Sequence, residues 1–75
     1  MSGYVVVFEG DDQSGYSAYS PDLPGVVAAG DTRAETEALM REAMVEHIAV
    51  LREMGEAVPA PVTHADATIL SIPAA

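Results

Sequence analysis

Carboxylates are the side chains of this sequence that could take part in the most kinds of chemistry. Twelve Asp and Glu residues stand against three Arg, and there is no Lys. A two-metal nuclease needs several carboxylates that converge on one point, usually with one in the middle of the first strand. Here that place is taken by Val5–Val7, while Glu9 follows at the end of the segment and Asp11 and Asp12 lie in the next turn. A reduced nuclease is therefore the alternative with least support, and we expect no catalytic residue and no enzyme.

The two histidines add little further chemistry. His47 falls on the apolar face of an expected helix, where a histidine usually packs with one satisfied hydrogen bond, and no partner for a general base is recognisable. His64 and Asp66 offer two possible metal ligands in a loop, without the further ligands that a site requires. The absence of Cys excludes disulfides and thiolate zinc sites. We expect no metal and no cofactor.

The charge balance indicates what kind of partner the chain could meet. The formal net charge is −9 at pH 7, whereas binding to nucleic acids or anionic membranes requires a cationic surface. The charge favours a basic protein partner, with solubility alone as the alternative. The opening MSGYVVVFEG has no basic segment and too short an apolar run for a signal peptide or a membrane span, which predicts a cytoplasmic protein.

Three short segments rich in β-branched, aromatic or small apolar residues predict strands over Tyr4–Glu9, Tyr16–Ser20 and Val26–Gly30. Turn residues separate them over Gly10–Gly15 and Pro21–Gly25, so the strands should form an antiparallel meander. The first segment is almost wholly apolar, which predicts a strand buried on both faces or centrally placed.

A helix should follow the third strand. Thr32 and Glu35 have the spacing of a capping box, and Gly55 is a C-terminal stop signal, so the helix should end near Met54. At about 100° per residue, one face collects mainly apolar residues that should cover the sheet: Thr36, Met40, Ala43, Met44, His47, Leu51 and Met54. Val45 and Ala49 fall outside this face and are expected at its rim or in a subunit contact.

The remaining segment reads as an extended connection over Gly55–Asp66 and a fourth strand over Ala67–Ile72. The predicted order is β-β-β-α-β, an α+β two-layer sandwich in one domain over residues 1–75. So short a chain builds a marginal core, yet 49% of its residues are hydrophobic. We therefore expect a homo-oligomer, a dimer or a tetramer, in which further apolar surface is buried.

These segments, in this order, resemble the HicB-like antitoxin domain. The stretch YVVVFEGDDQSGYSAYSPDLPGVVAAGDTRAE is similar to the start of that domain, and the resemblance continues to about residue 61. Its most specific part is a structural motif formed by two short runs: Pro21, Asp22, Leu23, Pro24 and Gly25, then Gly30, Asp31 and Thr32.

The resemblance implies a truncated ribonuclease H-like fold without catalytic carboxylates. It also implies an antitoxin that binds HicA, a small basic toxin that cleaves mRNA, and covers its active site. Many family members carry a C-terminal DNA-binding module, but only about fourteen residues follow Pro61 here, so direct DNA binding is not expected. The candidate toxin-binding residues are Glu9, Asp11, Asp12 and Asp22. The alternative is a stand-alone domain that has no toxin and binds itself or another protein.

Overall fold

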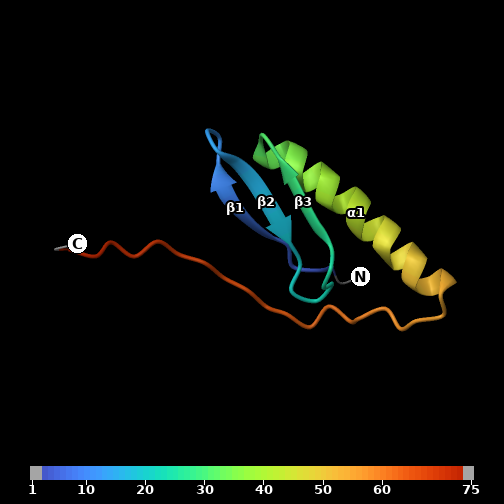
Figure 1. Cartoon of the computed structure of the whole chain (residues 1–75). Helices are drawn as coiled ribbons and strands as arrows, with labels where there is room; N and C mark the ends of the chain where they lie inside the picture. Colours follow the sequence, from blue (N-terminus) through green and yellow to red (C-terminus); the bar gives the residue numbers. More distant parts are fainter. Residues whose placement is uncertain (1–2, 74–75) are drawn as a thin grey trace.

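The computed structural model describes residues 3–73, which form a three-stranded antiparallel sheet, one helix and an extended arm (Figure 1). The elements follow the chain as β1 (Val7–Asp11), β2 (Gly15–Tyr19), β3 (Val27–Gly30) and α1 (Arg33–Glu53). The strand order in the sheet is β1-β2-β3, and α1 packs against β3 and β2 on one face. The predicted α+β class, with a β-β-β-α order up to the helix, is confirmed.

The first strand differs from its prediction in position and surroundings. It begins at Val7 rather than at Tyr4, because the Val7–Tyr19 pair is the last in the β1–β2 ladder. Beyond Tyr19 the chain turns away at Pro21, so residues 4–6 have no strand beside them. The strand is neither buried on both faces nor central: β1 is an edge strand, and its last three residues are exposed.

The Pro21–Gly25 corner turns the chain from β2 into β3. The Leu23 amide donates to the Ser20 carbonyl at 3.2 Å, and the Val26 amide donates to the Leu23 carbonyl at 3.4 Å. These two bonds direct the Leu23 side chain inward, where it is 0% exposed. The corner is therefore part of the core as well as a turn.

The core is small and lies between α1 and the inner face of the sheet. Its fully buried apolar members are Ala18, Leu23, Val26 and Met40. Partly buried side chains pack around them: Tyr4, Val6, Phe8, Ala28, Ala43, Met44 and Ile48. In the predicted helix face, Thr36 and Met40 are buried, but Met54 is exposed because the sheet ends before the last turn of α1. Val45 and Ala49 are exposed outside that face.

Both predicted ends of the helix are confirmed. Thr32 is the N-cap, and its hydroxyl oxygen accepts a hydrogen bond from the Glu35 amide at 3.1 Å. At the other end, Gly55 has a φ of 74°, and its amide donates to the Arg52 carbonyl at 3.1 Å. The Glu56 amide donates to the Leu51 carbonyl at 2.9 Å, which completes a Schellman motif and reverses the chain.

The predicted fourth strand over Ala67–Ile72 is not formed in the single chain. Residues 56–72 are an extended arm that runs back past the end of the sheet and then away from it (Figure 1). The Tyr4 hydroxyl donates to the Pro59 carbonyl and so fixes the first half of the arm. The second half lies beside no strand of its own sheet, and backbone without a neighbouring strand cannot form a ladder.

Replacing Gly10 with Ala should destabilise the protein more than replacing Gly25 with Ala. Both residues have a positive φ, which costs an L-residue about 1–2 kcal/mol, and there is open space around Gly25. A Cβ at Gly10 would in addition lie 2.0 Å from the Gly15 carbonyl oxygen, so the β1–β2 hairpin would have to open. Urea unfolding followed by circular dichroism compares the two variants. Equal losses would contradict this role of Gly10.

Candidate protein-binding surface

Asp11 holds the β1–β2 turn. Its Oδ1 accepts hydrogen bonds from the Gln13 amide at 2.9 Å, the Ser14 amide at 2.7 Å and the Ser14 hydroxyl at 2.8 Å. These bonds, first of all the one from the Ser14 amide, lower the pKa of Asp11 below its ordinary value. The carboxylate is therefore ionised and committed to the turn.

The other carboxylates at this end of the sheet are exposed. The Tyr16 hydroxyl donates to Asp12 Oδ1 at 3.0 Å, and this bond raises the pKa of Tyr16. Glu9 lies opposite Ser17 on the face of the sheet that α1 does not cover. Together with Asp31 and Glu35, Glu9 lines an open depression of about 650 Å³. Three glycines also line it, Gly10, Gly15 and Gly30, so backbone is accessible beneath the acidic rim.

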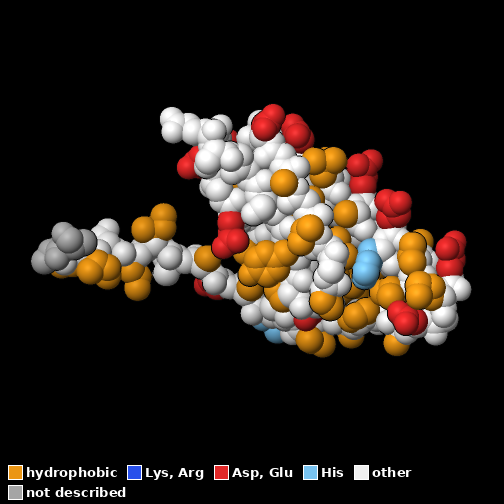
Figure 2. Space-filling view, viewed as in Figure 1, with side chains coloured by type: hydrophobic (Ala, Val, Ile, Leu, Met, Phe, Trp, Pro, Cys, Tyr) orange, Lys and Arg blue, Asp and Glu red, His pale blue; other side chains and the backbone are white. Residues whose placement is uncertain are grey.

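A stripe of glutamates continues from this depression along α1. Glu35, Glu42, Glu46 and Glu53 lie within about 40° of one another around the helix, at 100° per residue, and all four are exposed. Acidic side chains follow the outer edge of α1 in Figure 2, and no Lys or Arg is visible on that face of the molecule. We call Glu9, Asp12, Asp31 and the four stripe residues the acidic surface.

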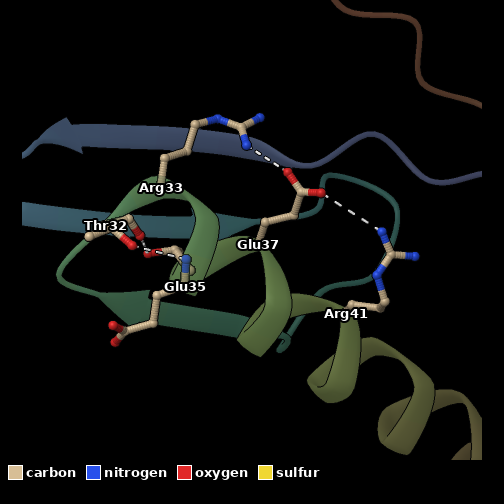
Figure 3. Close-up of polar contacts among 6 residues, drawn as sticks. Thr32, Arg33, Glu35, Glu37 and Arg41 are labelled. Carbon is tan, nitrogen blue, oxygen red and sulfur yellow. Dashed lines mark hydrogen bonds and ion pairs between the residues drawn. The ribbon is translucent and has the colours of Figure 1, made fainter.

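The few cations do not neutralise this surface. Arg33 Nη1 lies 2.6 Å from Glu37 Oε1, and Arg41 Nη2 lies 3.8 Å from Glu37 Oε2 (Figure 3). Arg33 also stands over the Phe8 ring, 3.9 Å from its centroid. Both ion pairs found in residues 3–73 thus end on Glu37, which does not belong to the acidic surface.

Asp22 lies apart from the other three candidate residues. It belongs to the corner between β2 and β3, at the opposite end of the sheet from the β1–β2 turn (Figure 1). Its Oδ2 accepts from the Val62 amide at 2.9 Å and the Thr63 amide at 2.8 Å, and its Oδ1 accepts from the Thr63 hydroxyl at 2.7 Å. The bonds from Thr63 and Val62 lower the pKa of Asp22. The structure gives Asp22 one clear task, which is to hold the arm.

Within residues 3–73, the histidines and the carboxylates do not gather into a metal centre. No group of three or more His, Cys, Asp or Glu side chains that could hold an ion is present in the described part of the chain. His47 is half-buried on α1, and His64 and Asp66 are exposed in the arm, where Asp66 accepts a hydrogen bond only from the amide of Ala67. Within residues 3–73, no helix combines the length and apolar character needed to cross a membrane.

Sequence reasoning selected the acidic turn but missed the glutamate stripe. The stripe was detectable as spacings of seven, four and seven residues between Glu35, Glu42, Glu46 and Glu53, which return to one side of a helix. From the sequence, Glu35 is predicted only as part of a capping box and Asp31 only as part of the family motif. Their position beside Glu9 depends on the pairing of β2 with β3, which no local pattern reveals.

Residues 3–73 thus form a small α+β domain whose acidic surface has no Lys or Arg partner among them. Residues 4–70 match the model of the HicB-like antitoxin of bacterial toxin–antitoxin systems. The chain belongs to this family, and the resemblance noted from its motifs is confirmed. Family membership indicates a non-enzymatic role in a toxin–antitoxin system.

A curated relative is similar over most of the chain. Antitoxin HicB 2 of Photorhabdus laumondii subsp. laumondii is 33% identical over 66 residues, which are 88% of this chain. The matched part is 47% of the relative, so the chain spans about half the length of that protein.

Acidification should release the arm through Asp22. Because the folded-state pKa of Asp22 lies below 3.8, its ionised form stabilises the arm contact at pH values above the unfolded-state pKa. That contribution is lost as the pH falls through the lower, folded-state pKa. Hydrogen exchange should show protection of the Val62 and Thr63 amides at neutral pH and its loss in strong acid.

Substitution of Asp22 separates this effect from general acid unfolding. Asp22→Ala should lose protection of both amides already at neutral pH while the β1–β2 ladder stays protected. Asp66→Ala, which removes an arm carboxylate whose one hydrogen bond within residues 3–73 comes from the next amide, is the matched control and should behave like the unmodified protein. Wild-type protection in Asp22→Ala would mean that another contact holds the arm.

Proposed function

We propose that this chain is an antitoxin that neutralises a small basic HicA-type toxin by covering its mRNA-cleaving active site. The observation that carries the proposal is the acidic surface, whose carboxylates have no Lys or Arg partner in residues 3–73. Family membership supports a toxin partner in general. A basic ribonuclease that binds RNA phosphates displays the opposite charge, so the two proteins would attract each other before contact.

The proposal assigns different parts to the four candidate carboxylates. Glu9 and Asp12, exposed at the hairpin end, would steer the toxin, and Asp11 would shape the turn that presents them. Asp22 would contribute indirectly, through the arm that it holds. With a net charge of −9, this segment would not bind nucleic acid itself.

Self-association is the second function that a specific observation favours. Ile69, Leu70 and Ile72 are exposed large hydrophobic residues in an arm that leaves the folded body. Such a surface favours a homo-oligomer, a dimer or a tetramer. The same feature would serve a stand-alone domain that has no toxin and binds only itself or another protein.

Recovery of the chain from its source cells distinguishes the two functions. An antitoxin should bring down a basic protein of under about 100 residues in stoichiometric amount, a size typical of one small domain. Adding the chain to that protein should then stop RNA cleavage at a one-to-one ratio of binding sites. Recovery of the bait alone, with no inhibited ribonuclease, would contradict the antitoxin function and leave the stand-alone domain.

Neutralising the hairpin charges should slow association with the toxin. The double variant Glu9→Gln/Asp12→Asn should lower the association rate constant about tenfold at low salt and reduce its salt dependence, since exposed charges act mainly on encounter. The matched control Glu56→Gln/Asp66→Asn removes the same charge from the arm, outside the acidic surface, and should have a much smaller effect. Stopped-flow mixing at several salt concentrations measures both. Equal effects would show that only net charge matters.

A further inference from the structure

The helix covers the inner side of β1 only in part. Because α1 packs against β3 and β2, a groove of about 500 Å³ remains between α1 and the segment that leads into β1. Its walls are mainly apolar, with Tyr4, Val6 and Phe8 on one side and Met44, Val45 and Ile48 on the other. Its charged residues are Glu37 and Arg41, which form an ion pair with each other.

The groove lies beside a free sheet edge. β1 pairs only with β2, so its other edge presents backbone N–H and C=O groups that no neighbouring strand of the described chain uses. An open edge is a template for a further strand, and alternate side chains of that strand point to one face of the sheet. A strand added at β1 would therefore place every second side chain in the groove.

The arm has the composition of such a strand. Residues 67–72 carry no ionisable side chain and include Ile69, which is 93% exposed, with Leu70 and Ile72 also exposed. In an extended segment Leu70 and Ile72 share one side with Thr68, whereas Ile69 lies on the other. The side with two large apolar residues is the one that fits the groove.

The arm is directed away from the body of its own chain. Asp22 fixes Thr63, and the nine residues from there to Ile72 reach about 30 Å when extended. The longest extent of the described chain is 53 Å against 26 Å for the next, and Figure 1 shows the arm as the projecting part. Each earlier reversal of the chain, near Asp11, Pro21 and Met54, ends at or is followed by a Gly. Residues 63–72 contain no Gly, Pro or Asn, so their sequence does not predict a turn that would bring the arm back to its own sheet.

We propose that Ala67–Ile72 of each chain adds as a strand to the free edge of β1 in a second copy, with Leu70 and Ile72 in the apolar groove. The inference rests on the self-association proposed above and specifies its contact. The charge of the chain also favours this contact. Two chains of −9 repel each other, but Ala67–Ile72 has no carboxylate and the Glu37 of the groove is paired with Arg41, so the chains can meet there without unpaired carboxylates. Reciprocal exchange gives a closed two-fold dimer.

Crosslinking between single-cysteine chains tests the contact, because the chain has no Cys of its own. Leu70→Cys should be mixed with Val45→Cys, on the groove wall, and treated with a short thiol-to-thiol crosslinker. The matched control is Val27→Cys, on β3 away from the groove; Val27 is 70% exposed and Val45 66%. The Leu70–Val45 mixture should give at least tenfold more linked heterodimer than the Leu70–Val27 mixture. Circular dichroism verifies that each variant is folded.

Sedimentation separates failure of this contact from failure of self-association. The unmodified chain should be a dimer, or a tetramer built from such dimers, and Leu70→Asp should shift it toward monomer. A dimer with no preference for the Leu70–Val45 link would overturn the arm exchange and leave self-association standing. A monomer would overturn both. Efficient linking within a diluted chain that carries both cysteines would show that the arm closes on its own groove.

Discussion

The burial of Leu23 is the constraint on which the rest of this structure depends. With only four fully buried apolar residues in the described core, the loss of one side chain removes a large share of it. Leu23 reaches the core because the corner around it is rigid: Pro21 and Pro24 fix φ, and two backbone bonds close the turn. The same corner sets β3 beside β2 and presents Asp22 to the arm.

The role of each carboxylate depends on the hydrogen-bond donors and cations that lie near it. Asp11 and Asp22 each accept three hydrogen bonds from nearby N–H and O–H groups, which fixes them as structural residues with lowered pKa. Glu37 is occupied by Arg33 and Arg41. Carboxylates such as Glu42 and Glu46 have no such partners among the described residues. They stay hydrated and are therefore available to interact with a basic protein. One residue type thus serves both the fold and the proposed recognition.

The sequence correctly predicted those features of the fold that depend on residues only a few positions apart. Thr32 and Gly55 bound the helix because capping involves groups a few residues apart. The position of β1 was wrong by three residues, since register depends on where β2 ends. The fourth strand was expected because residues 67–72 have strand composition, but pairing needs a neighbour that composition cannot supply. For the candidate surface, the sequence predicted Glu9, Asp12 and Asp22 as one group. It could not show that Asp22 lies far from the other two, because that distance is set by the tertiary fold.

The geometry of α1 allows the two proposed contacts to coexist. Groove residues such as Met44 and Ile48 lie roughly 140–180° around the helix from the centre of the glutamate stripe, at 100° per residue. A second copy in the groove would therefore leave Glu42 and Glu46 exposed. Pairing two chains also doubles the acidic charge that a basic protein meets, which strengthens long-range attraction without any new contact. A chain whose own core is small can in this way gain stability from a second copy and keep its acidic surface for a different partner.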